Sequence, residues 1–316
     1  MKARNILAAA LLLAMVSAAS ADRFGTDGNQ FTMDFVTISG SSNPNSGYGI
    51  VNNDYRMGKF EVTNGQWDKF KASLGVPVAG NPSIAYDDAP HHTGANVPTN
   101  CVSWYEAAQF VNWLNTSTGH QAAYKFTGTQ GTGNYTLATW STDEADGGTN
   151  LYRHKDAVYF LPTEDEWVKA AYWNGTTLQT YANASPSDLI SGSPDPTKWN
   201  YATSSFGDVP WPIGSGGEEL NGTFDMMGNV WEWMESPYCD TSYGTGSSRG
   251  LRGGSCADTF FGLGDYYLAS SSRYYYDSDG DGAGNIGFRV ASEVPEPATL
   301  ALLAVGGLAM IRCRRI

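Results

Sequence analysis

A long stretch of this chain lacks any helical or strand periodicity, yet it carries large aromatic side chains. Residues 175–222 contain clusters of Gly, Ser and Pro, together with Trp199, Phe206 and Trp211. A disordered linker would be poor in aromatic residues, and irregular loops longer than about 15 residues are uncommon inside compact domains. We therefore predict an ordered loop that aromatic packing, with or without a bound metal, holds against the core.

Periodic apolar residues predict a few regular elements around this loop. Phe31, Met33 and Phe35 alternate with other residues in 31–40 and indicate a strand with one buried face. Residues 55–63 predict a second strand that pairs with the first or continues it. Residues 124–156 are rich in Gly and Thr, and we interpret them as an inserted hairpin or loop.

Three segments have helix-start signals followed by a helical spacing of apolar residues. Thr63 can cap the first helix, and the pairs Ser103/Glu106 and Thr163/Glu166 form capping boxes, in which each side chain satisfies a backbone N–H at the helix start. The residues expected to face the core are Trp67, Phe70 and Leu74, then Ala107, Phe110, Val111 and Leu114, then Trp167, Ala170 and Ala171.

The first 21 residues have the pattern of a secretory signal peptide. Lys2 and Arg4 precede an apolar stretch that is too short to span a bilayer comfortably, and residues 19–21 have the small-x-small form that signal peptidase requires. We expect signal peptidase to remove residues 1–21. The alternative is an N-terminal membrane anchor.

The last residues, 294–316, combine a Pro-Glu-Pro turn, an apolar run from Ala298 to Ile311 and a tail of three arginines. Taken alone, the run could be a permanent anchor with its basic end in the cytoplasm. The whole pattern resembles the PEP-CTERM sorting signal of Gram-negative bacteria. That resemblance implies transient membrane insertion, recognition by an exosortase, cleavage near Pro295–Pro297 and release to the cell surface or the extracellular polymer.

Charge and cysteine content limit what residues 22–293 can do. Without both terminal segments the chain has 14 basic and 31 acidic residues, which argues against nucleic-acid binding and suits calcium or a cationic partner. The alternative is that the acidity serves solubility outside the cell. Cys101, Cys239 and Cys256 allow at most one intramolecular disulfide, so this is no disulfide scaffold. Either Cys256 pairs with Cys239 or its thiol stays reduced and half-buried, while Cys101 is expected to be a small core residue.

Six motifs occur in an order that resembles the sulfatase-modifying-factor family, which includes the formylglycine-generating enzymes. They are MGKFEVTNGQW (57–67), VPTNCVSWYEAAQFVNWL (97–114), YFLPTEDEWVKAAYW (159–173), GTFDMMGNVWEW (222–233), LRGGS (251–255) and GNIGFRVA (284–291). The match covers roughly residues 31–292. It implies an α+β fold of the C-type-lectin-like kind, with low regular secondary structure and a few helices around small antiparallel sheets.

The resemblance also implies calcium, which takes about six to eight hard oxygen ligands. The first site would use the Asp225 and Glu232 side chains and the Gly228 and Val230 carbonyls. The alternative is that no metal binds here, that the acidic side chains are solvated and that the neighbouring tryptophans only pack. A second site would use Asn200, the Tyr201 carbonyl and Asp208.

A third calcium candidate comes from the residues alone. Residues 277–288 begin like an EF-hand loop, with Asp277, Asp279 and Asp281 at positions one, three and five and Gly282 at six. Position twelve is Phe288, so the bidentate carboxylate is missing. A weak calcium loop and an acidic surface turn both remain open.

The expected copper centre of the active relatives is incomplete. Those enzymes resemble oxidases that hold copper between two cysteines, three and eight residues after the serine of RGGS. Here these positions are Asp258 and Leu263, and Cys256 directly follows Ser255. Copper(I) prefers two thiolates. We therefore expect no copper, and Cys256 is the one candidate catalytic thiol.

The chain lacks the residues that other enzyme classes need. The iron-dependent sulfoxide synthases of this superfamily need an additional histidine-bearing helical domain, and no Gly-x-Ser-x-Gly elbow appears.

Arg252 and Arg289 are expected to be buried ion-pair or stacking partners. The segment after RGGS lines the ligand groove in the family, and residues 265–276 place Arg273 and several tyrosines nearby, which suits a peptide or glycan ligand; core packing is the alternative.

Together these features favour an exported, calcium-stabilised domain of the formylglycine-generating-enzyme type that acts as a non-catalytic binding or surface module. One alternative is an active oxidase that converts a sulfatase cysteine to formylglycine. Another is a structural component of the extracellular polymer.

Overall fold

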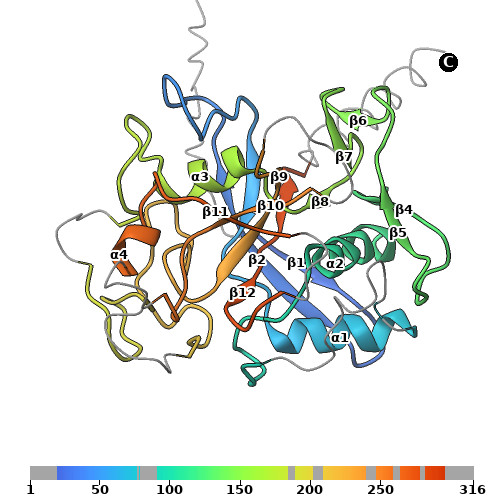
Figure 1. Ribbon diagram of the computed structural model, residues 1–316, viewed down its shortest axis with the longest axis horizontal. Coiled ribbons are helices and arrows are strands. Elements are labelled where there is room, and N and C mark those ends of the chain that lie inside the picture. Colours follow the sequence, from blue (N-terminus) through green and yellow to red (C-terminus); the bar gives the residue numbers. More distant parts are fainter. Residues whose placement is uncertain are drawn as a thin grey trace, which may run out of the picture.

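The computed structural model describes residues 20–76, 78, 91–183, 189–201, 209–239, 247–258, 264–277 and 282–295. Its strands form two main sheets and two short hairpins (Figure 1). The first sheet contains, in spatial order, β1 (Ser20–Phe24), β2 (Phe31–Ile38), β3 (Tyr55–Gly58), β13 (Ala291–Glu293) and β8 (Tyr159–Phe160). The second contains β11 (Tyr274–Tyr276), β10 (Arg249–Arg252), β9 (Trp231–Pro237) and β12 (Ile286–Gly287).

The remaining elements are two hairpins and four helices. The hairpins pair β4 (Lys125–Thr127) with β5 (Thr136–Ala138) and β6 (Ala145–Asp146) with β7 (Asn150–His154), so the inserted hairpin expected in 124–156 is present twice. The helices are α1 (Asn64–Leu74), α2 (Trp104–Ser117), α3 (Glu164–Tyr172) and α4 (Gly264–Tyr267). None of the helices in the described residues is long and apolar enough to cross a membrane.

The first sheet follows the predicted alternation. Phe31, Met33 and Phe35 are buried on one face of β2, and β3 pairs with β2 in antiparallel register. β1 begins at Ser20, so cleavage after residue 21 would remove the first two residues of this strand. The residues that fasten β1 lie beyond that point: Asp22 pairs with Arg56 at 2.7 Å, and Phe24 is buried.

Capping boxes start all three longer helices. The Ser103 hydroxyl accepts the backbone N–H of Glu106, whose carboxylate accepts the backbone N–H of Ser103, and Thr163 and Glu166 repeat the arrangement. At α1, Gln66 completes a box with Thr63 that the sequence interpretation did not include. The predicted inward residues are buried, except that Leu74 is only partly buried.

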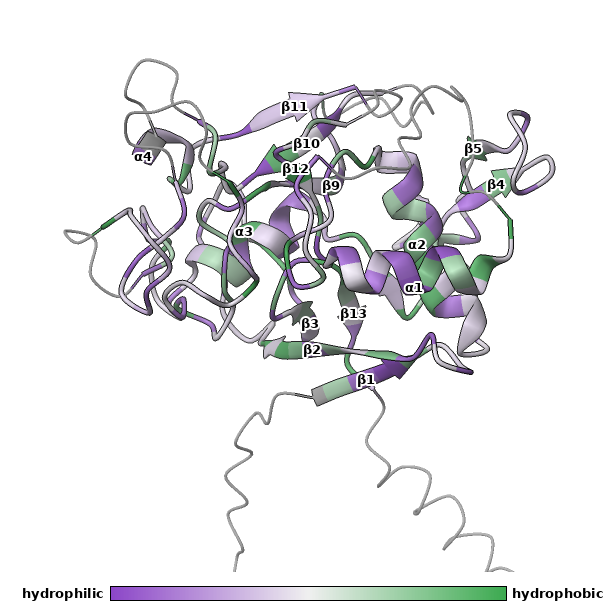
Figure 2. Cartoon of the chain, turned by 90° about the horizontal axis from the view of Figure 1, so that it is seen from below, coloured by the Kyte–Doolittle hydropathy of each residue, from purple (hydrophilic) through white to green (hydrophobic). Residues whose placement is uncertain are grey.

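Aromatic packing joins these elements into one core. Figure 2 shows the two sheets on opposite sides of the molecule, with the longer helices at a level between them. Trp67 of α1 and Phe288 both pack against Phe110 of α2, with ring centroids 5.8 Å and 5.5 Å away. In the long irregular stretch Trp199 and Trp211 are buried as predicted, whereas Phe206 lies outside the described residues.

The second sheet differs from the antiparallel expectation at one edge. β12 runs parallel to β9, with Ile286 opposite Trp231, while the other strand pairs are antiparallel. This sheet has two distinct faces, because successive side chains of a strand point to opposite sides. One face carries buried ion pairs, and the other carries the site described next.

Candidate functional site

An aromatic pocket of about 390 Å³ opens on one face of the second sheet. The residues that line it are Trp231, Leu251, Ala257, Asp258, Tyr267, Tyr274, Tyr276, Ala283, Asn285 and Ile286. A volume of this size is typical of sites for small organic ligands. We refer to this cavity as the aromatic pocket.

Strand register explains why these residues meet. Ile286 lies opposite Trp231, and Leu251 lies opposite Tyr274. Residues that oppose each other in adjacent strands project from the same face of a sheet. Tyr267, at the end of α4, covers this face, with its ring centroid 5.5 Å from that of Trp231. The wall is therefore assembled from four strands and a short helix that lie far apart in the sequence.

Asp258, in the turn after RGGS, is the one acidic side chain among the described residues that line the pocket. One of its carboxylate oxygens accepts the Trp231 indole N–H at 3.1 Å, and the other accepts the backbone N–H of Ser255 at 2.6 Å. Burial raises the pKa of Asp258 above its ordinary value, and these two hydrogen bonds offset the effect only in part. Among the described lining residues there is no lysine, arginine or histidine to neutralise this carboxylate.

Cys256 does not face this cavity. It is fully buried, and its backbone N–H donates to the Asn229 carbonyl at 2.9 Å. The expected pairing with Cys239 is wrong, because Cys101, Cys239 and Cys256 form no disulfide. The other alternative was a reduced, half-buried Cys256 thiol, and Cys256 is more deeply buried than that. Cys101, expected in the core, is only partly buried and has a φ of +56°. Leu263 lies outside the described residues.

Arginines on the opposite face of the sheet have the predicted structural roles. Arg289 pairs with Glu232 at 2.5 Å, and Arg252 pairs with Glu164 at 2.7 Å, with all four side chains buried. Arg273 also binds Glu164, at 2.7 Å, and does not line the aromatic pocket. The tyrosine rings against its guanidinium are not those of residues 265–276 that the sequence suggested: the guanidinium lies 4.5 Å from the ring centroid of Tyr238 and 5.1 Å from that of Tyr48.

The turn at residues 225–230 brings the first set of calcium candidates close to further buried acids. Asp225 has a φ of +61°, and its carboxylate accepts the Gly214 N–H at 2.7 Å. Glu61, which the sequence interpretation missed, accepts the Asn229 side-chain amide at 2.8 Å and the Val230 N–H at 3.3 Å. Burial raises the pKa of Asp225 to about 6, and that of Glu61 well above its usual range.

Two properties of this turn bear on a metal. Both Glu232 oxygens already have donors, from Arg289 and from the Trp167 indole N–H at 2.7 Å. Gly228 has a φ of +91° where an added Cβ would lie 2.2 Å from the Asn200 carbonyl oxygen. No group of three or more His, Cys, Asp or Glu in the described residues could hold a metal ion. A metal here would therefore need amide or carbonyl oxygens as well.

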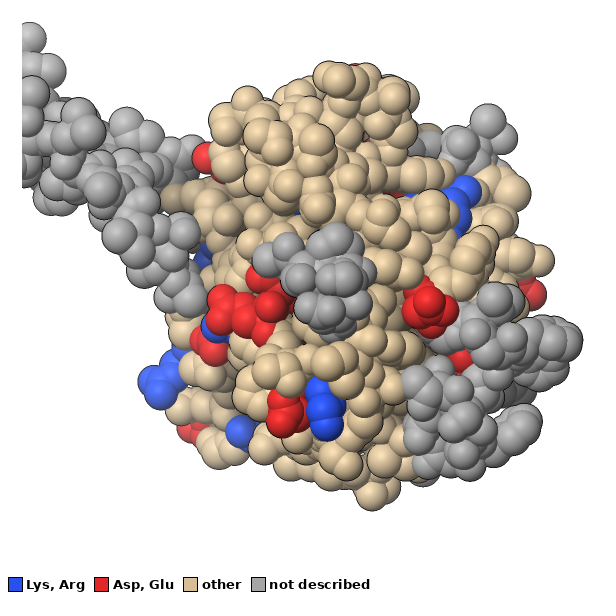
Figure 3. Space-filling view, turned by 90° about the vertical axis from the view of Figure 1, so that its left-hand side faces the viewer, with Lys and Arg blue, Asp and Glu red and all other residues tan. Residues whose placement is uncertain are grey.

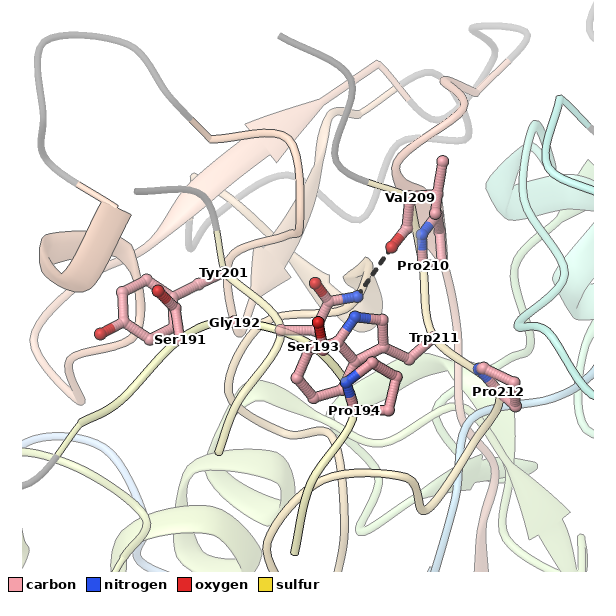
Figure 4. Close-up of a pocket in the computed structure, with 10 residues that line it drawn as sticks. Ser191, Gly192, Ser193, Pro194, Tyr201, Val209, Pro210, Trp211 and Pro212 are labelled. Atoms are coloured by element: carbon pink, nitrogen blue, oxygen red, sulfur yellow. Dashed lines mark hydrogen bonds between the residues drawn. The ribbon is translucent and has the colours of Figure 1, made fainter. Parts of the chain in front are cut away.

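The second set of calcium candidates lies beside the same turn. The Asn200 side-chain amide donates to the Val209 carbonyl at 3.0 Å, which is the dashed line in Figure 4. It also donates to the Asn229 side-chain oxygen at 2.9 Å. Asn200 and Tyr201 line a separate hollow of about 520 Å³, together with prolines and Trp211. Asp208 lies outside the described residues, and Asn200 and Tyr201 are neighbours in the chain, so this three-residue site stays a prediction.

The EF-hand-like segment is only partly described. Asp277 accepts the Ser248 hydroxyl at 2.9 Å, and Gly282 has a φ of +70°. Phe288 is buried in the core, consistent with its unsuitability as a ligand. Asp279 and Asp281 lie outside the described residues.

On the face of the molecule in Figure 3, acidic and basic side chains are scattered among uncharged residues.

Sequence reasoning missed several pocket residues. Trp231 appeared only as a packing residue beside a calcium ligand, and Asn285 and Ile286 were part of a motif with no assigned role. The alternation in Trp231-Glu232-Trp233 contained a signal, because it places Trp231 and Glu232 on opposite faces of a strand. Which face opens to a pocket is a property of the assembled sheet.

Comparisons with known proteins agree with this geometry. The sequence model of the sulfatase-modifying factor enzyme 1-like domain matches residues 21–294, and that of the PEP-CTERM protein-sorting motif matches residues 293–315. The chain is 27% identical to the chaperone protein LppX of Paenibacillus barcinonensis over 256 residues, which cover 72% of this chain and 81% of LppX. It is 32% identical to the mouse inactive C-alpha-formylglycine-generating enzyme 2 over 143 residues, 43% of this chain and 44% of the mouse protein.

A solved structure has the same fold. Treponema denticola variable protein 1 superposes with a TM-score of 0.57 at 22% sequence identity, over 87% of this chain and 99% of that protein. The α+β arrangement of small sheets and few helices is thus the C-type-lectin-like fold that the motifs predicted.

Proposed function

Because the chain belongs to the sulfatase-modifying factor enzyme 1-like domain family, we propose that it is an exported, non-catalytic binding module whose ligand occupies the aromatic pocket. The observation that carries this proposal is Asp258. It stands where the first cysteine of the copper pair is expected, and Trp231 and Ser255 hold its carboxylate by hydrogen bonds. A hard carboxylate is a poor ligand for copper(I), whereas an aromatic pocket with one fixed polar group suits ligand binding.

The sorting motif indicates export and sorting to the cell surface in Gram-negative bacteria, and it implies recognition by an exosortase. We also propose that signal peptidase removes residues 1–21. β1 supports this cleavage point, since Asp22 binds both Arg56 and the Tyr159 hydroxyl, at 2.7 Å and 2.8 Å, and would remain in the mature chain.

A peptide-oxidation assay tests the non-catalytic part. The mature chain is incubated with copper(I), oxygen and a cysteine peptide of the sulfatase type, beside an active formylglycine-generating enzyme as positive control. We expect no formylglycine by mass spectrometry and no stoichiometric copper. Turnover by the unaltered chain would refute the proposal.

Calcium at the 225–230 turn is the second part of the proposal. The supporting observation is the local charge: Glu61, Asp225 and Glu232 are all buried, and Arg289 is the cation that acts on all three. Buried carboxylates that outnumber their cations are costly unless they are protonated or coordinate a metal. Asp225, Glu61 and nearby carbonyl oxygens are of the chemical type that calcium prefers.

Chelation tests the metal. Excess calcium at about 100 times its Kd would stabilise the fold by about 2.7 kcal/mol, so we expect EGTA to lower the melting temperature of the unaltered chain. In Asp225→Ala the melting temperature should no longer depend on calcium. Asp277→Ala, in the EF-hand-like segment, is the matched control and should keep the calcium dependence. An unaltered melting temperature in EGTA would refute calcium binding in the folded protein.

A further inference from the structure

The aromatic pocket combines aromatic rings with the half-buried carboxylate of Asp258, which is the one carboxylate among its described lining residues. Trp231 lies centrally, with the ring centroids of Tyr267 and Tyr274 at 5.5 Å and 5.6 Å. Asp258 is joined to the same Trp231 indole by a hydrogen bond of 3.1 Å. The negative faces of aromatic rings attract cations, and a carboxylate beside them adds a full charge of the same sign.

We infer that the aromatic pocket binds a small organic ammonium compound, with its cationic nitrogen against the rings of Trp231 and Tyr274 and near the Asp258 carboxylate. This inference rests on the proposed function, because it assigns a ligand class to the same site. Charge complementarity supports it. No basic side chain lines the pocket in the described residues, and the domain as a whole is strongly acidic.

The chemistry of the pocket also argues against other small ligands. An anion would meet the Asp258 carboxylate without a cation to offset the repulsion. A neutral ligand would cover this carboxylate without adding a counter-charge, although the hydrogen bonds from Trp231 and Ser255 offset the cost of its burial only in part. An ammonium ion removes this cost, while Leu251 and Ile286 supply apolar contacts for its carbon atoms.

Binding of matched cationic and neutral probes to the mature chain tests the inference. Choline is compared with 3,3-dimethylbutan-1-ol, which has the same shape without charge, and n-butylammonium is compared with n-butanol, which has the same chain length. Isothermal titration and Trp fluorescence report binding. We expect at least one cation to bind about tenfold more tightly than its neutral partner. The two pairs distinguish a methylated from a primary ammonium group.

Two neighbouring tyrosines provide a variant and its control. Tyr274 lines the pocket and is 48% exposed, whereas Tyr275 is 46% exposed, does not line the pocket and stacks on Tyr238 at 4.5 Å, with its ring centroid 5.8 Å from that of Tyr274. Tyr274→Leu should weaken binding of the cation about three- to tenfold, and Tyr275→Leu should weaken it clearly less. Asp258→Asn should weaken the cation more than the neutral probe, provided that its near-ultraviolet circular dichroism is unaltered.

The outcomes separate this inference from the proposed function. Equal binding of cation and neutral partner, or equal effects of Tyr274→Leu and Tyr275→Leu, would refute the ammonium ligand and leave a binding module with another ligand. Absence of binding by all four probes would also refute it. Formylglycine production refutes the proposed function independently of these titrations.

Discussion

Arg153 holds two buried carboxylates together, and its removal gives a quantitative test of the electrostatics in the core. The guanidinium binds Glu166 at 2.9 Å and 3.0 Å and Glu235 at 2.8 Å, and it lies 3.5 Å from the ring centroid of Phe160. Arg153 is 4% exposed, and Glu166 and Glu235 are buried as well. Arg153→Met would keep most of the side-chain volume and leave both acids without their cation.

We expect this variant to lose about 3–5 kcal/mol of unfolding free energy, the range for a buried pair that loses one partner. For a domain of this size the melting temperature should fall by roughly 6–20 °C. Urea denaturation followed by tryptophan fluorescence measures the free energy directly. Lys71→Met is the control, because Lys71 forms an exposed pair with Asp68 at 3.6 Å and should cost at most about 0.5 kcal/mol.

The pH dependence of the loss shows whether charge is the cause. Burial acts to raise the pKa of Glu166, but Arg153 outweighs it, so the folded-state pKa is lowered and Glu166 contributes stability that disappears as pH falls through that pKa. Burial raises the pKa of Glu235 despite Arg153. Without Arg153 both values should lie above the unfolded ones, so the variant loses stability as pH rises.

The difference between variant and unaltered protein should therefore be larger at about pH 8 than at about pH 5. A loss of the same size at both pH values would mean that packing against Phe160, and not the two carboxylates, accounts for the effect. That result would refute the electrostatic reasoning.

Two further variants test local structure. Ser103→Ala removes a buried capping hydroxyl and should cost about 1 kcal/mol in urea denaturation; no measurable loss would contradict the role of this capping box. Gly228→Ala places a Cβ 2.2 Å from the Asn200 carbonyl oxygen at a φ of +91°, whereas Gly119→Ala has a similar φ of +82° and no atom within 4 Å. We expect Gly119→Ala to cost about 1–2 kcal/mol and Gly228→Ala to cost clearly more by the same assay, so equal losses would show that the close approach is relieved without cost.

Local signals in the sequence were sufficient for α1, α2 and α3 and for the strands β2 and β3, but they did not predict α4 or β1. A capping box is read within four residues, and the buried faces of α2 and β2 follow from spacings of four and two residues. The ordered nature of the long loop was also predictable, because Trp199 and Trp211 need a buried environment. The order of the six motifs predicted the family, the pattern of residues 294–316 predicted the sorting signal, and the two family models confirmed both predictions.

The tertiary structure alone decided which distant side chains meet. Asp258 binds Trp231 across 27 residues, Glu61 reaches Asn229 across 168, and Arg153 joins Glu166 to Glu235, which is 82 residues away from Arg153. Contacts between such distant residues produce no periodic pattern in the sequence. Each contact depends on the register of the strands and the path of the loops, and not on the neighbouring residues in the chain. The sequence by itself determined that positions 258 and 263 after RGGS are not cysteines. The tertiary structure decided, through the parallel pairing of β12 with β9, that Ile286 lies beside Trp231 in the wall of an aromatic pocket that also includes Asp258.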